Sequence, residues 1–228
     1  MLYGYGDDLL RGLAVTILVG VSAIPLMLLL GLLGAWGKLS ANPAARTLAG
    51  AYTTIVRGIP ELVLILLVYY GVTILLQNAL DAILGGDSRI NIDPFTAGTI
   101  TLGTIYGAFA TEVFRGAFQA LDRGQIEAAY SAGMSKGLAF RRIMLPQVWR
   151  FAIPGLGNLW LVLIKATALM SVVQLTELMR ASDIAARNTK LYFTFYFSAS
   201  IIYLLITIIS LQVLHRAEAW ANRGIRRD

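Results

Sequence analysis

The sequence predicts an all-α integral membrane protein with about five transmembrane helices. Of its 228 residues, 57% are hydrophobic and 14% are charged, and the mean hydropathy is +0.68. Charged residues are spaced so that long uncharged stretches separate them, and a helix needs about 20 apolar residues to cross a bilayer. This composition excludes an ordinary soluble domain.

The expected spans follow one another along the whole chain. The third and the fourth are too short to cross without carrying a charged group into or near the membrane. The five lie at about 12–36, between Glu61 and Asp81, from Phe95 to Phe118, from Arg150 to beyond Lys165, and between Lys190 and His215.

Two of these spans contain ionisable residues, which are costly in a membrane and therefore functional candidates. In the third, Glu112 and Arg115 share a helical face. They either form a structural ion pair near the inner boundary or line the substrate path. In the fourth, Lys165 precedes Thr167. Lys165 either belongs to the substrate path, snorkels to the outer surface, or pairs with Glu177.

A polar, basic segment at about 122–150 separates the third and fourth spans. Asp122 is a potential N-cap for a helix over 125–132, and Gly133 can end that helix in a left-handed conformation. Ser135 can cap a second helix that continues until Pro146. The alanines of the first helix are small, so another surface could approach its backbone closely.

Within this segment, Glu127-Ala128-Ala129 is followed after three residues by Gly133, and after nine more by Ile143-Met144-Leu145-Pro146. This pattern resembles the cytoplasmic docking loop of bacterial ABC-importer permeases at every defining position. Upstream, Arg57-Gly58-Ile59-Pro60-Glu61-Leu62-Val63 and the later Tyr69-Tyr70 resemble the polar amino-acid uptake branch. The chain is similar to Q-type permeases of importers for histidine, lysine, arginine and ornithine, or for opines.

The resemblance implies a type I ABC-importer (MetI-like) fold, with residues 1–228 as one transmembrane domain and 122–150 as its coupling loop. The chain would form half of a translocation path driven by ATP hydrolysis on separate subunits. Its expected partners are a second permease subunit, two cytoplasmic ATP-binding subunits, a periplasmic substrate-binding protein and membrane lipid. The implied ATPase-docking residues are Glu127, Ala128, Ala129, Gly133, Ile143, Leu145 and Pro146.

The resemblance also implies that this chain binds no cofactor and has no ATPase activity, since ATP and Mg would be held by the partner subunits. No metal site and no nucleic-acid binding are expected. Because most Lys and Arg lie in the segments on one side, the positive-inside rule places the N-terminus in the periplasm and the C-terminus in the cytoplasm of a bacterial inner membrane. The stretch from Lys165 to Lys190 disagrees with that assignment.

Glu61 and Glu112 favour a basic substrate, although Glu61 could instead pair with Arg57. One alternative is the same architecture serving a neutral or acidic polar amino acid such as glutamine or glutamate. Another is a self-sufficient secondary transporter, which would be expected to have inverted repeats and a carboxylate relay at the midplane.

Overall fold

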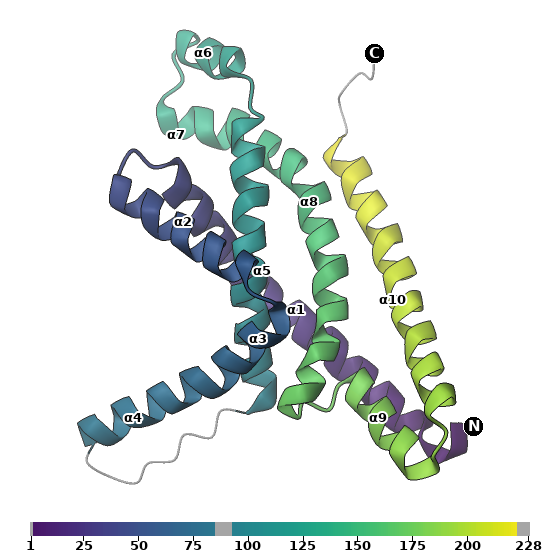
Figure 1. Ribbon diagram of the computed structural model, residues 1–228. Coiled ribbons are helices and arrows are strands. Elements are labelled where there is room, and N and C mark those ends of the chain that lie inside the picture. The colour runs from purple at the N-terminus through teal and green to yellow at the C-terminus, as the bar shows by residue number, and fades with distance from the viewer. Residues whose placement is uncertain (1, 85–92, 223–228) are drawn as a thin grey trace.

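The computed structural model describes residues 2–84 and 93–222, and within these the chain is helical throughout, without strands. Figure 1 shows long helices running between two ends of the molecule, with short helices at each end. The 3-10 turn η1 (Leu2–Gly4) precedes α1. The helices are α1 (Gly6–Leu39), α2 (Pro43–Gly58), α3 (Glu61–Leu66), α4 (Thr73–Leu84), α5 (Pro94–Gln119), α6 (Arg123–Ser131), α7 (Lys136–Ala139), α8 (Leu145–Ala166), α9 (Leu178–Thr189) and α10 (Tyr192–Ala221).

Three further helical segments join these elements without a break in the chain. Two are wide π-helical segments, η2 (Leu67–Val72) between α3 and α4, and η3 (Phe140–Met144) between α7 and α8. The third, η4 (Thr167–Val173), is a 3-10 continuation of α8.

The core is built around α5, which crosses α1 at close range. Small residues make this crossing possible. A Cβ added to Gly34 would lie 2.2 Å from Thr111 Oγ1, and one added to Gly103 would lie 2.9 Å from Leu26 Cβ. A Cβ added to Gly107 would likewise lie 2.8 Å from Leu30 Cβ, so α1 covers the face of α5 that carries Gly103 and Gly107.

The helix α8 packs on the other side of this core. At its centre, a Cβ on Gly155 would lie 2.7 Å from Val113 Cγ1 of α5. Two residues later, a Cβ on Gly157 would lie 2.0 Å from Leu214 Cδ1 of α10. α8 is thus held between α5 and α10 at its midpoint.

A second, smaller hydrophobic cluster joins α9 to the first turn of α1 and the start of α10. Glu177 caps α9, and its carboxylate accepts hydrogen bonds from Met179 N, Arg180 N and the Tyr203 hydroxyl, at 2.8, 2.7 and 3.0 Å. Neither α9 nor the amphipathic α2 was expected, since both lie outside the five predicted spans.

All five expected spans are helical in the part of the chain that the structure describes. By length and apolar composition alone, three helical stretches there can cross a membrane. A fourth qualifies if α2 and the stretch Glu61–Gly71, which are bent by 112° relative to each other, count as one span. α5 is not among these stretches, and Gly and Thr make up much of its buried face. The sequence count of five exceeds this number.

Candidate docking and transport sites

The candidate docking segment is the coupling loop expected at residues 122–150. It has the local structure that its residues predict. Asp122 caps α6, accepting a hydrogen bond from Gly124 N at 2.8 Å. α6 ends at Gly133, whose φ of +80° lies in the left-handed region. Gly133 N donates to Tyr130 O at 2.9 Å and Met134 N donates to Ala129 O at 3.1 Å. These two bonds form a complete Schellman motif, which fixes the direction in which the chain leaves α6.

The second half of the segment continues directly into α8. Ser135 caps α7 by accepting from Leu138 N at 3.4 Å. The wide turn η3 follows, and Pro146 then occupies the first turn of α8, where its missing N–H does no harm. The second helix was expected to continue until Pro146, and in the structure Pro146 lies at the start of the next element, α8.

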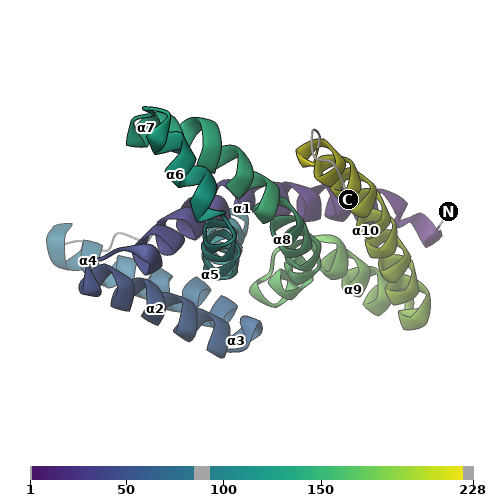
Figure 2. The ribbon, with the colours of Figure 1, turned by 90° about the horizontal axis from the view of Figure 1, so that it is seen from above.

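The docking residues differ in how much of their surface is accessible. Ala129 is buried, whereas Ile143 and Leu145 are half-buried. Glu127, Ala128, Gly133 and Pro146 are exposed. A hydrogen bond of 2.8 Å from Gln147 Nε2 to Gln125 Oε1 ties α6 to α8. Figures 1 and 2 place α6 and α7 at the end of the molecule to which the C-terminal part of α10 also points.

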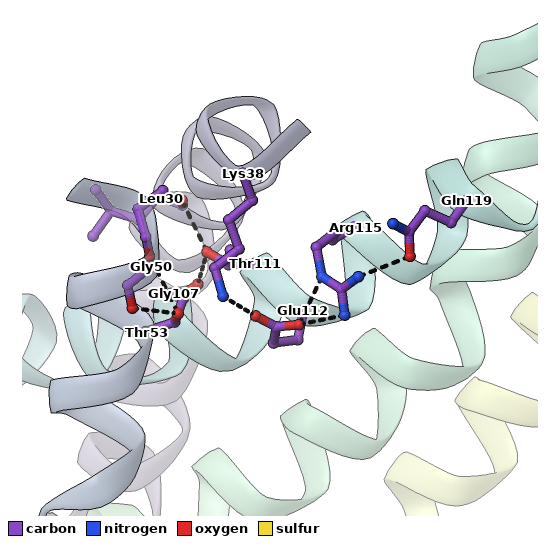
Figure 3. A network of polar contacts seen from close by, with 10 residues as sticks. Leu30, Lys38, Gly50, Thr53, Gly107, Thr111, Glu112, Arg115 and Gln119 are labelled. Atoms are coloured by element: carbon purple, nitrogen blue, oxygen red, sulfur yellow. Dashed lines mark hydrogen bonds and ion pairs between the residues drawn. The ribbon is translucent and has the colours of Figure 1, made fainter. Parts of the chain in front are cut away.

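The charged residues of α5 form one network with α1, drawn in Figure 3. Glu112 accepts from the Lys38 ammonium and, at 2.8 Å, from Arg115 Nε. Arg115 Nη1 also donates to Gln119 Oε1 at 2.7 Å. The predicted Glu112–Arg115 ion pair is confirmed, and Lys38 is a second cation that the sequence did not indicate. The three charged side chains carry a net positive charge, so Glu112 is already neutralised.

Glu61 has a different environment, at the sharp bend between α2 and α3. Its carboxylate accepts from the Tyr106 hydroxyl of α5, at 3.2 and 3.3 Å. The alternative that Glu61 pairs with Arg57 is wrong, because the Arg57 guanidinium lies over the Phe109 ring, 5.4 Å from its centroid. Among the described residues, no cation forms an ion pair with Glu61.

The end of α8 carries the remaining candidates. Lys165 is exposed. Thr167 is buried and donates to Ile164 O at 2.7 Å. The alternative that Lys165 pairs with Glu177 is wrong, because that carboxylate takes its hydrogen bonds from the α9 backbone and Tyr203. η4, which starts at Thr167, contacts both α3 and α5. Glu61 and Thr167 therefore lie on elements that meet.

Comparison with known proteins matches residues 11–223 to the family described as "Binding-protein-dependent transport system inner membrane component". The chain belongs to this family of permeases. The all-helical MetI-like fold is the family's own.

Sequence relatives cover the whole of this permease. The histidine/lysine/arginine/ornithine transport system permease protein HisQ of Escherichia coli K12 is 44% identical over 100% of this chain and 99% of its own. The nopaline transport system permease protein NocQ of Agrobacterium fabrum C58 is 44% identical over 98% and 94%. The octopine transport system permease protein OccQ of Rhizobium radiobacter is 42% identical over 98% and 94%.

Solved structures agree with the sequence relatives. A crystal structure of an amino acid ABC transporter with histidines superposes with a TM-score of 0.80 at 32% identity, covering 94% of each chain. The inward-facing MetNI methionine ABC transporter superposes with a TM-score of 0.69 at 16% identity, covering 98% of each chain, and shows the shared fold.

Two residues that bond the candidate carboxylates, Lys38 and Tyr106, were not identified as their partners from the sequence. Lys38 was assigned only to the orientation count, and Tyr106 was not considered. Each lies far along the chain from its carboxylate partner. The available signal was weak in both cases: a lysine ending an apolar stretch, and a tyrosine beside Gly107 in the third span.

Proposed function

We propose that this chain is the inner-membrane permease subunit that forms half of the translocation path of an ABC importer for a basic amino acid or an opine. The full-length likeness to HisQ, NocQ and OccQ supports this substrate class. In this proposal the N-terminus lies in the periplasm and the docking segment lies in the cytoplasm.

The single observation that carries the proposal is the geometry of the docking segment. α6 presents the exposed Glu127 and Ala128, and the Schellman motif at Gly133 holds it at a fixed angle to α7 and α8. A short, rigidly mounted helix with small exposed residues is suited to insertion into a groove of another protein. We assign that groove to a cytoplasmic ATP-binding subunit, one of two that would bind ATP and Mg and perform all the hydrolysis.

The remaining partners follow from the same assignment. One chain builds half of a path, so a second permease subunit completes it, and a periplasmic binding protein delivers the substrate. No covalent chemistry on the substrate is required. Movement of α6 changes the tilt of the helices around the path, and this exposes the path alternately to the two sides of the membrane.

For substrate selection, we place Glu61 rather than Glu112 in the path. Glu61 lies at the α2–α3 bend, near η4, and has a neutral hydroxyl partner. It therefore keeps an uncompensated negative charge for a passing guanidinium or ammonium. Glu112 already binds two cations, so its attraction for a third is weak. Thr167 and Lys165 lie at the end of α8 that adjoins this region.

The test is uptake by the complete transporter reconstituted in liposomes, with a panel of labelled amino acids and octopine. We expect ATP-dependent uptake of arginine, lysine, histidine or ornithine. Glu61→Gln should lower uptake of these cations about tenfold, corresponding to the loss of one charge-assisted contact, while the complex still assembles. Uptake of glutamine or glutamate instead would establish the alternative substrate class. ATP-independent uptake by this chain alone would refute the assignment.

A further inference from the structure

A hydrophobic groove lies between α8 and α10, away from Glu61, and Trp149 near the end of the 122–150 segment forms part of its wall. Its cavity measures about 430 Å³ and is walled by α1, α8 and α10, with Trp160, Ile209 and Val213 among its lining residues. Two polar side chains of the lining bond each other, since Trp160 Nε1 donates to Ser210 Oγ at 3.0 Å. The rest of the lining is hydrophobic apart from the indole N–H of Trp149, and such a surface suits hydrocarbon.

A second cavity of about 400 Å³ continues the groove toward the docking end of the molecule. Trp149 and Ile153 line both cavities, and the second adds Arg150, Trp220 and the docking residue Pro146. α8 and α10 run side by side along this length (Figures 1 and 2). The hydrophobic lining at one end and the lining at the other, where Arg150 joins Trp149 and Trp220, make the groove amphipathic.

Arg150 is fixed in place yet keeps hydrogen-bonding capacity. Its Nε donates to Asn222 Oδ1 at 2.9 Å, and its guanidinium lies 5.5 Å from the Phe151 ring centroid. Within residues 2–84 and 93–222, no acceptor bonds its two terminal nitrogens. Glu218, the acidic residue of α10, lines neither cavity. An oriented guanidinium fork is well matched to a phosphate.

We propose that this groove binds an anionic phospholipid, with an acyl chain between α8 and α10 and the headgroup phosphate at Arg150. Charge complementarity selects this occupant. In the proposed orientation Arg150 lies at the cytoplasmic leaflet, where anionic headgroups gather and where tryptophans sit at the interface. The inference rests on the proposed function only for that orientation.

The test uses the complete transporter in cells, with a photoreactive benzoylphenylalanine at Val213. This residue lines the groove and is 60% exposed. Ile208, which is exposed and lines neither cavity, carries the same probe as the matched control position. After irradiation, mass spectrometry identifies what is attached to the chain.

We expect phospholipid adducts at Val213 that are enriched in phosphatidylglycerol or cardiolipin relative to adducts at Ile208. Arg150→Gln should lower this enrichment about fivefold, the effect of one basic residue on an anionic lipid at a membrane surface. The control Arg142→Gln removes an exposed charge near the same end and should leave the enrichment unchanged.

Two results would overturn the proposal. Cross-linking of Val213 to another protein would mean that a partner subunit covers the groove. Lipid adducts with the composition found at Ile208, insensitive to Arg150→Gln, would mean that the groove is simply bathed in bulk lipid. Neither result depends on transport, so a failure here is distinct from a failure of the uptake assay.

Discussion

Glu112 is the shared ion-pair partner of the charged residues where α1 and α5 meet. Its carboxylate pairs with both Lys38 and Arg115. The side chains of these three residues are only 19% to 35% exposed. Removing the shared acceptor leaves two cations poorly compensated, whereas removing one cation leaves Glu112 its other partner. The arrangement is a structural clamp between two helices that are distant in sequence.

Glu112→Gln should therefore lower the free energy of unfolding of the detergent-solubilised complex by about 1.5–3 kcal/mol, since its bonds are charge-assisted. Lys38→Gln should cost less, because Arg115 still bonds the carboxylate. The apparent midpoint of thermal unfolding would show the difference.

The matched control for Glu112→Gln is Arg187→Gln, which breaks a solvent-exposed ion pair. On α9, the hydrogen bond from Arg187 lowers the pKa of Asp183 below its usual range. Because solvent screens this pair, its loss should barely change the midpoint. Equal midpoints for Glu112→Gln and Arg187→Gln would contradict the clamp.

At the scale of single elements, the turn after α6 offers a clear comparison between two glycines. Gly133 has φ +80°, whereas Gly137 lies within α7, and a Cβ at either position meets nothing within 4 Å. Any difference between alanine substitutions at the two positions is therefore conformational, or arises from a partner.

Gly133→Ala should weaken the turn by about 1 kcal/mol because an L-residue is strained there, while Gly137→Ala should favour α7 by a similar amount. We expect Gly133→Ala to lower substrate-stimulated ATP hydrolysis by the complex and Gly137→Ala to preserve it. A purified complex whose ATPase activity is unaffected by Gly133→Ala would show that the angle of α6 is unimportant for docking.

The elements also show what sequence can and cannot predict. Asp122, Gly133 and Ser135 act on backbone groups within a few residues, so local chemistry was enough to predict the caps and the left-handed turn. Glu61 and Glu112 were identified as candidates, but their partners Tyr106 and Lys38 come from other helices, and one sequence without contacts cannot supply them. α2 and α9 were not predicted. Each is amphipathic, and its polar residues between two apolar spans are also typical of a loop.

At the scale of the whole molecule, the crossing of α1 and α5 sets how closely the bundle packs. Gly34→Leu would place a side chain where Thr111 already lies, 2.2 Å from the added Cβ. Overpacking of this kind costs about 1–3 kcal/mol, so the yield of folded permease should fall. Gly50→Leu, at a site on α2 with nothing within 4 Å, is the control and should express normally. Equal yields would show that the crossing is not tightly packed.

The orientation of the whole chain can be tested with single cysteines, because the sequence has none of its own. Lys136 and Lys190 are both exposed and lie in segments at opposite ends of the molecule in Figure 1. With an impermeant thiol reagent outside intact cells, Cys at Lys190 should react and Cys at Lys136 should not. A cysteine at Asp87 is expected to behave like Lys190, although that position lies outside the described residues. The reverse pattern would put the docking segment in the periplasm.

The close contact of Gly155 with Val113 gives α8 a central point about which the whole helix could tilt. α8 has 22 residues, about 33 Å at 1.5 Å per residue, and Gly155 stands at its middle. With the pivot there, the two arms are equal. A tilt imposed where α8 receives the docking segment would reappear at η4 with the same size and the opposite direction. Such a rigid helix would neither amplify nor reduce the movement, so under the proposed docking the distance moved at the ATP-binding subunit would set directly how far the other end moves.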